Sequence, residues 1–398
     1  MTHSSHSIVI VGGGFIGPLM AMTLGARYGR IYLIDPTPTT YQVSAPTDGR
    51  AIALTQPSKQ LLERLGVWPD IAPRAQPLLS VVTQDESGAT LRLSAREDNF
   101  GEPFGHMVDS KVIRLAILKQ LHKQSHVTFL TNQVVQLEYQ DPFQSSLVVH
   151  LITGEALPAS LVIGADGARS RLRLSANLRT HQWPYNQTAF VRLYQHTSSH
   201  YGCAHEKFLE TGPFAILPLP NRCSSIVWTA NAEKAEELRS LSAVDFDKAA
   251  FKHMEGYVGL TPYSSVSAFS LNALWVPFFT THRLALIGDA AHQIHPLAGQ
   301  GLNLGMHDVA ALAETLAEGA DLGLDIGSQT LLKRYEQRQR AQHLAFLGVT
   351  HGLNRLFSND DETLQWLRTK GLEFVEKTPN LKQFFVQHGT GVKHPVAQ

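Results

Sequence analysis

The chain has few of the residues that mark several other classes of protein. Only two cysteines, Cys203 and Cys223, occur in 398 residues, and neither stands in a CxxC pair. This count argues against a disulfide framework and is typical of a reducing compartment. No uninterrupted apolar run approaches the roughly 18 residues of a membrane span. The first residues, MTHSSHS, are few and polar, so we expect no signal peptide and a cytoplasmic protein.

An excess of charge of either sign is also absent. Lys and Arg together number 34, and so do Asp and Glu. A balanced charge creates no long-range field that would attract nucleic acid, so no nucleic-acid partner is expected. No metal site is predicted either.

What the chain does have begins at its N-terminal end. The run 7–11 (SIVIV) is short and continuously apolar, as in a buried parallel strand. Gly12, Gly14 and Gly17 follow as GxGxxG, and Asp35 ends the next expected strand. These glycines permit a tight turn, the approach of a pyrophosphate and close helix packing, while the acid binds ribose hydroxyls. The pattern predicts a dinucleotide site and leaves FAD and a nicotinamide dinucleotide as alternatives.

A second glycine-rich stretch, LIGDAAHQIHPLAGQGLNLG, occupies residues 286–305. Gly288 lets the backbone come close to a ligand, and Asp289 places a carboxylate where hydroxyl groups could donate to it. Gly299 and Gly301 are expected to take turn conformations that a β carbon would forbid. A helix expected from about Leu302 would aim free N–H groups and a partial positive charge back into the site.

One further position is a candidate on a weaker pattern. Asp166 follows the apolar run LVIGA, and the carboxyl end of such a strand is a common site position in an open sheet. The alternative is a simple Asp-Gly turn. Arg50 lies in the loop DGRAIAL and Arg114 in the helix expected at 110–124, and by position alone each fits a surface arginine.

From about residue 177 the pattern changes to strands rich in Val, Ile, Phe, Trp and Tyr. They predict a mostly antiparallel sheet that shapes a substrate pocket. Phe214, Ile216, Leu217 and Trp228 are expected to face or support that pocket, although strand alternation lets only some of them point inward.

Taken together, these motifs resemble those of the group A flavoprotein aromatic hydroxylases, above all the ubiquinone-pathway hydroxylases. Their second flavin motif reads GD/N-A-A-H/Q-x-x-H-P-x-A-G-Q-G-x-N-L-G. The segments TDGRAIAL, GPFAILPL and LGVTHGLNRLF look most like the 2-polyprenyl-6-methoxyphenol hydroxylase branch. Two features depart from the family: Glu206-Lys207-Phe208 replaces Glu-Arg-Phe, and the C-terminal end lacks an RxxMG-like sequence.

The resemblance implies an α/β fold with a Rossmann-like FAD-binding domain of the glutathione-reductase-like, p-hydroxybenzoate-hydroxylase type. That domain would be discontinuous (1–75, 98–176 and 274–330). A mostly antiparallel β-sheet substrate domain would comprise 76–97 and 177–273. Residues 331–398 would form a C-terminal helical region.

The resemblance also implies roles for single residues. The implied FAD-binding residues are Gly12, Gly14, Gly17, Asp35, Arg50, Arg114, Asp166, Gly288, Asp289, Pro296, Gly301, Leu302 and Asn303. The implied catalytic positions are His295, Pro296, Gly299 and Gly301, with Pro296 as a wall of the flavin ring. His292 and His295 could equally be structural hydrogen-bonding residues, and no general base for the substrate is identified.

The implied reaction is the hydroxylation of a polyprenylated phenol in ubiquinone biosynthesis, with NAD(P)H, O2 and a flavin C4a-hydroperoxide. Another phenol hydroxylase, a prenyl reductase and a flavin-free carrier of prenylated cargo are the alternatives. The amphipathic stretch 331–357 is either a solvated helix face or a contact with the inner membrane or a ubiquinone-pathway complex. A homo-oligomer, the ring carbon, the prenyl length and the choice of NADH or NADPH stay open.

Overall fold

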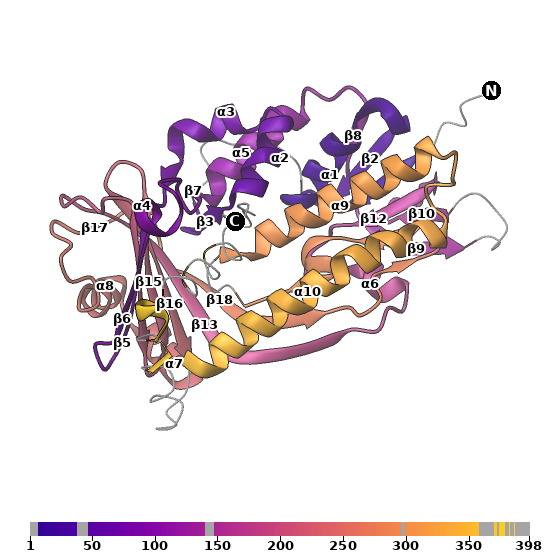
Figure 1. Ribbon diagram of the computed structural model, residues 1–398. Helices are drawn as coiled ribbons and strands as arrows, with labels where there is room; N and C mark the ends of the chain where they lie inside the picture. The colour runs from indigo at the N-terminus through magenta and orange to yellow at the C-terminus, as the bar shows by residue number, and fades with distance from the viewer. Residues whose placement is uncertain are drawn as a thin grey trace.

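The computed structural model describes residues 7–37, 47–139, 147–295 and 299–357, together with 370–371, 374–378, 382 and 386. The molecule is elongated, with a parallel sheet and its helices at one end and a large antiparallel sheet at the other (Figure 1). The last long helix, α10, runs between the two ends.

The parallel sheet has the strand order β19-β20-β12-β1-β2-β8, and only β19 pairs in the antiparallel sense. Its central strand β1 is fully apolar and buried, as the continuous run predicts. The strands are β1 (Ile8–Val11), β2 (Ile31–Asp35), β8 (Val127–Thr131), β12 (Leu161–Gly164), β19 (Thr280–Thr281) and β20 (Leu284–Leu286).

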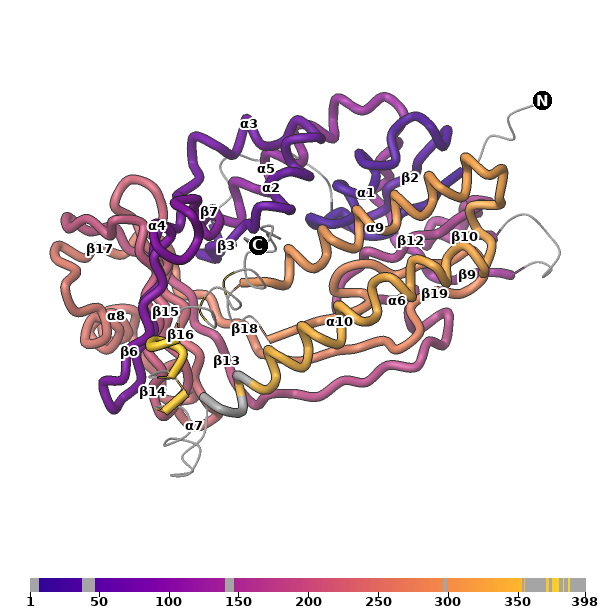
Figure 2. The backbone as a smooth tube through the Cα atoms, in the orientation of Figure 1, coloured from indigo at the N-terminus to yellow at the C-terminus, as the bar shows by residue number. Residues whose placement is uncertain are grey.

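Helices cover this sheet, and the two longest, α9 and α10, lie side by side across it (Figure 2). The helices at this end of the molecule are α1 (Ile16–Leu24), η1 (Gly25–Tyr28), α2 (Gln56–Arg64), α3 (Trp68–Ile71), η2 (Ala72–Arg74), α5 (Ser110–Leu121), α6 (Arg171–Ser175), η3 (Gly288–Ala290), α9 (Gly301–Asp321) and α10 (Gln329–Phe357). A small antiparallel sheet of β9 (Val134–Tyr139), β10 (Leu147–Leu151) and β11 (Ala156–Ala159) leads back into β12.

The large sheet has the order β21-β18-β13-β16-β15-β14-β5-β6, with β17 paired to β13. Its strands are β5 (Ser80–Asp85), β6 (Thr90–Ser94), β13 (His181–Gln195), β14 (Cys203–Leu209), β15 (Gly212–Leu219), β16 (Cys223–Asn231), β17 (Thr261–Pro262), β18 (Ser267–Trp275) and β21 (His292–Gln293). Helices α7 (Ala232–Ser240) and α8 (Ala243–Phe251) pack on one face.

Between the two main sheets lies a three-stranded sheet of β3 (Ala51–Leu54), β7 (His106–Asp109) and β4 (Gln76–Pro77). The short helix α4 (Ala95–Asp98) follows β6. Ala51, Ala53 and Met107 of this small sheet join a hydrophobic cluster with Leu193 and Leu217 of the large sheet. This cluster packs the two ends of the molecule together beside the glycine-rich loops.

The expected α/β fold is confirmed. The segment after β16 forms two helices, because Ser242 caps a new helix by accepting the backbone N–H of Asp245. Strand β13 begins at His181, and its pairing with β18 shifts between Pro184 and Gln187. The polar and proline residues at this irregularity hide the strand pattern.

Candidate flavin and substrate site

The GxGxxG loop joins β1 to α1, and two of its glycines are required by packing. A β carbon at Gly12, where φ is +117°, would lie 2.1 Å from the carbonyl oxygen of Ala165. A β carbon at Gly17 would lie 1.9 Å from the carbonyl oxygen of Gly12. At Gly14, in contrast, a β carbon would meet nothing within 4 Å. The structure therefore leaves space next to the loop at Gly14, where a pyrophosphate is expected.

Two charged side chains fix this loop. The Asp35 carboxylate accepts the N–H of Gly13 at 2.6 Å and the N–H of Thr37 at 2.7 Å. Arg114 donates to the carbonyl oxygen of Gly13 at 3.3 Å. Both residues therefore lie at the dinucleotide loop, as predicted, and Arg114 reaches it from α5.

The N-terminal end of α1 fits a phosphate group. No side chain caps this helix and no acidic residue stands in its first turn, so its free N–H groups and partial positive charge stay available. Such helix ends bind phosphate groups through the same N–H groups. The observed end is thus suited to the pyrophosphate of a dinucleotide.

Asp289 fits the hydroxyl groups of a cofactor. It follows Gly288, which has a positive φ of +60°, at the end of β20. The Asp289 side chain is exposed to solvent, yet burial by surrounding protein raises the pKa of its carboxyl. A group that protein surrounds but solvent still reaches lines a recess. Among the described residues no hydrogen bond to this carboxylate is found, so a ligand hydroxyl is a suitable partner.

We predict that Asp289→Ala weakens FAD binding by about 10- to 150-fold, because a charge-assisted hydrogen bond contributes roughly 1.5–3 kcal/mol. Titration of the FAD-free protein, followed by flavin fluorescence, measures the dissociation constant. Asp245→Ala is the control, because that carboxylate is exposed on α8, which packs on the large sheet and not at the glycine-rich loops. Equal FAD affinity in Asp289→Ala and wild type would contradict the assignment.

Of the two glycines expected to need a special backbone conformation in the turn before α9, one has it and the other does not. Gly301 is the first residue of α9, without a positive φ, and a β carbon there would meet nothing within 4 Å. The prediction of backbone strain at Gly301 was therefore wrong. Gly299 has the left-handed backbone, with φ +62°, and lies against Ala53. A glycine at position 301 could also allow a flavin ring to come close to the backbone. The open space beside Gly301 is compatible with this, and it stays a prediction. Pro296 lies outside the described residues.

Asn303 uses its side chain to join α9 to β3. Its Nδ2 donates to the carbonyl oxygen of Ala53 at 2.7 Å, and its Oδ1 accepts the N–H of Thr55 at 3.1 Å. Leu302, beside it, is half-buried. No side chain caps α9 and no acid stands in its first turn, so its N-terminal amides remain suited to negative charge.

A buried cluster that the sequence analysis did not predict supports the Gly288 turn. Asp308 of α9 accepts the N–H of Gly288 at 2.9 Å and Nε2 of His292 at 2.6 Å on one oxygen. Its other oxygen accepts Nε2 of His343, from α10, at 2.7 Å. Burial alone would raise the pKa of Asp308, but the two imidazoles outweigh this and hold it far below its usual range.

The three side chains could also hold a metal ion, because their ligand atoms lie within 4.8 Å of one another. Both imidazole Nε2 atoms already donate to the carboxylate, however, and these hydrogen bonds account for the cluster. Its place under Gly288 indicates a supporting role for the flavin turn. Asp308 and His343 carry no local motif, so only the tertiary structure identifies them.

The Asp166 carboxylate caps the helix that follows it. Its Oδ2 accepts the N–H groups of Arg171 at 2.8 Å and Leu172 at 3.3 Å. Burial raises the pKa of this carboxyl. Arg173, also buried, donates to the carbonyl oxygens of Ala168 and Ala290. These contacts tie the Asp-Gly motif to the Gly288 turn, and a direct contact of Asp166 with FAD stays a prediction.

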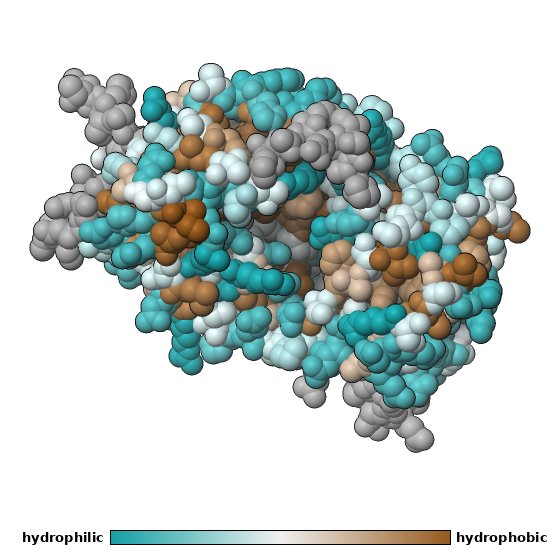
Figure 3. Space-filling model, turned by 180° about the vertical axis from the view of Figure 1, so that it is seen from behind, coloured by the Kyte–Doolittle hydropathy of each residue, from teal (hydrophilic) through white to brown (hydrophobic). Residues whose placement is uncertain are grey.

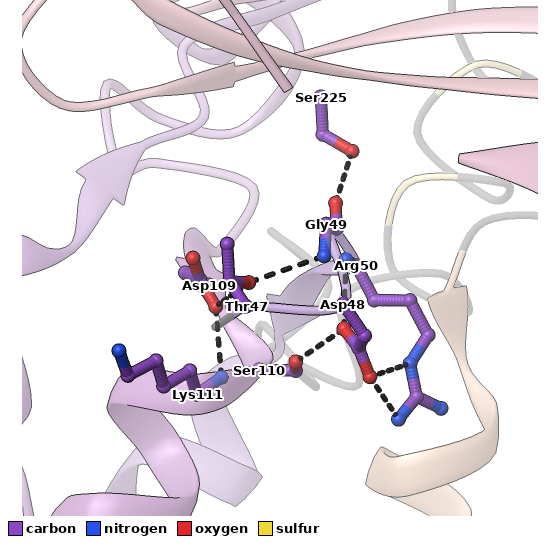
Figure 4. Close-up of polar contacts among 8 residues, drawn as sticks. All are labelled: Thr47, Asp48, Gly49, Arg50, Asp109, Ser110, Lys111 and Ser225. Carbon is purple, nitrogen blue, oxygen red and sulfur yellow. Dashed lines mark hydrogen bonds and ion pairs between the residues drawn. The ribbon is translucent and has the colours of Figure 1, made fainter. Parts of the chain in front are cut away.

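The loop before β3, which carries Arg50, contacts the large sheet through a hydrogen bond between Gly49 and Ser225 (Figure 4). Arg50 forms an ion pair with Asp48 at 2.6 Å, and its guanidinium lies 5.1 Å from the ring centre of Phe269. Ser225 donates to the carbonyl oxygen of Gly49 at 2.7 Å. Burial would raise the pKa of Asp48, but hydrogen bonds from Arg50 and Ser110 lower it. Arg50 is exposed here, beside both the flavin loops and the sheet.

His295 is buried between β13 and the flavin turn. Its Nε2 lies 3.2 Å from Oε1 of Gln187, and its ring meets that of Tyr185 edge to face at 4.8 Å. Burial lowers the pKa of His295 to about 4. The imidazole is therefore neutral at physiological pH, which favours a hydrogen-bonding role over one as an acid.

This depressed pKa predicts an acid sensitivity. The unfolded chain binds a proton at His295 below its ordinary pKa of 6.5, whereas the folded chain does not until about pH 4. Stability is therefore lost as the pH falls from 6.5 to 4, by about 3 kcal/mol from this group. Urea unfolding of His295→Asn should show a correspondingly flatter pH dependence. His150→Asn, at an exposed ion pair with Glu138, is the control and should keep the wild-type slope.

The large sheet presents two different faces. Phe214, Ile216 and Trp228 pack on its outer face against α7 and α8. Of the four residues expected to face or support the pocket, only Leu217 therefore lies on the inner face. The inner face carries the alternate residues Glu206, Ala215, Leu217, Val227 and Phe269. All five are half-buried, in contrast to the fully buried outer face. The molecule is hollowed near its centre, with apolar residues inside the hollow (Figure 3).

A separate groove of about 530 Å³ lies where α10 crosses β13 and β18. It is lined by Thr180, His181, Gln182, Trp183, Trp275, Leu344 and Leu347. None of these residues belongs to the glycine-rich loops, so the groove is separate from the flavin site.

The comparisons with known proteins agree with this geometry. Residues 5–346 match a family model described as an FAD binding domain, which makes this chain an FAD-binding protein of that class. Two solved structures share its fold: p-nitrophenol 4-monooxygenase PnpA from Pseudomonas putida DLL-E4 and PqsL from P. aeruginosa. PnpA has a TM-score of 0.78 at 19% identity, covering 98% of this chain and 100% of its own. PqsL has a TM-score of 0.76 at 18% identity, covering 93% and 99%.

Curated relatives define the family more narrowly. Ubiquinone hydroxylase UbiL of Rhodospirillum rubrum is 36% identical over 385 residues, which is 96% of this chain and 89% of the relative. The 3-demethoxyubiquinol 3-hydroxylase of Escherichia coli is 31% identical over 98% of this chain and all of the relative. The chain belongs to the family of FAD-dependent ubiquinone-biosynthesis hydroxylases.

Proposed function

We propose that this protein is a monooxygenase that hydroxylates the aromatic ring of a polyprenylated phenol in ubiquinone biosynthesis, with NAD(P)H as reductant and O2 as co-substrate. The names of the relatives support the substrate class. The observation that carries the proposal is the contact between the flavin-side loop and the inner face of the large sheet, in a molecule that is hollowed near its centre (Figure 3). Ser225 and Arg50 connect these two parts directly.

Bound FAD supplies the redox chemistry and the activation of O2, and the protein supplies binding, orientation and exclusion of water. Gly12, Gly14 and Gly17 with α1 would hold the pyrophosphate, and Asp289 a hydroxyl group of the cofactor. The N-terminal amides of α9 would stabilise negative charge that develops on the ring system.

The apolar inner face fits an aromatic ring. Ala215, Leu217 and Val227 present small or aliphatic side chains that keep surface open. We propose that residues 76–97 and 177–273 form the substrate domain and that 1–75, 98–176 and 274–330 bind FAD. Within the described residues, no helix combines the length and hydropathy of a membrane span. We propose cytoplasmic localisation, with α10 as a candidate for peripheral contact with the membrane that holds the prenylated substrate.

Isotope labelling tests this function. The FAD-loaded protein is incubated with NADPH or NADH, ¹⁸O2 and 2-geranylphenol, and the product is analysed by mass spectrometry. We expect one ¹⁸O atom in the aromatic ring and faster oxidation of the reductant when the phenol is present. A product with a hydrogenated prenyl chain would instead identify a reductase. Absence of any flavin-dependent product would contradict the proposal.

A further inference from the structure

Glu206 is a carboxyl group on the inner face of the large sheet. Its neighbours on β14, His205 and Lys207, point to the outer face, where the His205 ring meets Tyr257 and Lys207 pairs with Glu255 at 3.3 Å. Since side chains alternate along a strand, Glu206 points the other way. It is paired in register with Ala215 of β15.

Glu206 has no charged partner within the part of the chain that the structure describes. Its cross-strand neighbours on this face are Thr83 of β5 and Ala215 of β15. Among the described residues we find no hydrogen bond or ion pair to its carboxyl group, and desolvation by burial is the one cause that perturbs it. Burial of a carboxyl without a partner is costly, and such groups are mostly found where they act on a ligand.

The inner face faces the flavin loops. In the next row of the sheet, Ser225 holds the carbonyl oxygen of Gly49, and Val191 lies against Gly49. Two strands beyond β16, Phe269 lies beneath the guanidinium of Arg50. Glu206 therefore stands on the same surface that meets the flavin-side loop, with Ala215 and Val227 between them.

Resting on the proposed function, we propose that Glu206 is the catalytic base that binds the hydroxyl group of the substrate phenol and takes its proton. The phenol O–H bond breaks, an O–H bond forms on the Glu206 carboxylate, and the electron pair stays on the phenol oxygen. The resulting phenolate is more electron-rich at its ring carbons, which electrophilic hydroxylation requires. No further reactant is needed for this step.

The acidity of Glu206 suits this role. Burial raises its pKa to about 7. A base works best when its pKa lies near the working pH, since it is then largely ionised and still holds a proton well. Among the described residues, the titratable groups around this face include Asp85 of β5, whose carboxylate accepts from Ser87 and Ala89. They also include Asp48, Arg50, Asp109, Cys223 and, at β6, Glu376 with Lys382. None of them pairs with Glu206.

The test compares two substrates in wild type and Glu206→Gln. For 2-geranylphenol, kcat/KM should fall about 10²- to 10⁴-fold in the variant. For a fluorinated analogue that is already ionised at the assay pH, the fall should be less than tenfold, because no proton needs to be removed. The dissociation constant of 2-geranylphenol, measured without reductant through the change in flavin absorbance, should rise less than tenfold in the variant. Glu206→Asp should restore part of the lost rate.

The pH profile gives an independent readout on the wild-type protein. Its kcat/KM for 2-geranylphenol should decline below about pH 7, and this decline should be absent with the ionised analogue. Glu255→Gln, on the outer face, should leave both profiles unchanged. A wild type that does not hydroxylate either phenol would overturn the proposed function and this assignment with it. Full activity of Glu206→Gln on both phenols, or equal losses on both, would overturn the assignment alone.

Discussion

Replacing Gly17 with alanine is expected to leave a protein that binds no FAD and unfolds at much lower urea concentration. The new β carbon would lie 1.9 Å from the carbonyl oxygen of Gly12, which is backbone and cannot move like a flexible side chain. Gly12 itself is confined between Ile34, whose carbonyl oxygen accepts its N–H at 2.8 Å, and Ala165. We expect a loss of stability of roughly 4 kcal/mol or more.

Gly14→Ala is the matched control in the same loop. A β carbon there meets nothing within 4 Å, so the variant should fold with wild-type stability. Its methyl group would nevertheless occupy the space beside the loop, so FAD binding should weaken at least tenfold, or by about 1.4 kcal/mol. Urea unfolding and flavin fluorescence measure the two effects separately. If both variants bind FAD as wild type does, the loop does not hold the pyrophosphate.

These two glycines show which parts of the site a sequence can predict. The strand, the GxGxxG loop, the helix and Asp35 lie within 35 residues, and their roles follow from local backbone geometry. The structure brings Gly12, Gly13 and Asp35 together as expected. Arg114 came from a resemblance alone, and its contact with Gly13 becomes visible only when α5 is packed on the loop.

The substrate pocket was harder to predict, because it depends on which face of the large sheet turns toward the flavin loops. Alternation shows that Phe214 and Ile216 share one face and Ala215 and Leu217 the other. The sequence does not show which face turns to the flavin loops. The larger side chains belong to the outer face, where α7 and α8 cover them. The pocket face instead carries small residues and Glu206, a composition that leaves room for a ligand.

Of the residues that support the flavin turn, the sequence indicated only His292, as a possible hydrogen-bonding residue. Asp308, His292 and His343 come from α9, β21 and α10, and their contacts span up to 35 residues of chain. Each residue alone fits a helix or loop of ordinary composition. Their meeting under Gly288 makes α10 part of the flavin site, since His343 reaches the same carboxylate that holds the Gly288 N–H.

We expect Asp308→Asn to lower stability by about 3–5 kcal/mol, because it removes the negative charge from a buried network and replaces one of its two acceptor oxygens with an NH2 donor. The neutral amide oxygen that remains accepts more weakly and serves only one side of the network, so FAD should bind more weakly than in wild type. Urea unfolding gives the stability, and titration with FAD gives the affinity. Tyr335→Phe is the control: it removes a single hydrogen bond from α10 to Leu286 and should cost only about 1 kcal/mol.

The pH dependence separates this network from ordinary packing. The folded-state pKa of Asp308 is depressed, so its contribution to stability is present above its ordinary pKa of 3.8 and is lost as the pH falls below it. Burial also lowers the pKa of His343, so its neutral form favours the folded state and stability declines as the pH falls below 6.5. Both pKa shifts therefore reduce the stability of the folded protein at low pH. The Asp308→Asn variant should lose the part of this decline that begins below pH 3.8, whereas Tyr335→Phe should keep it. A variant with wild-type stability, FAD affinity and acid sensitivity would show that α10 does not support the flavin turn.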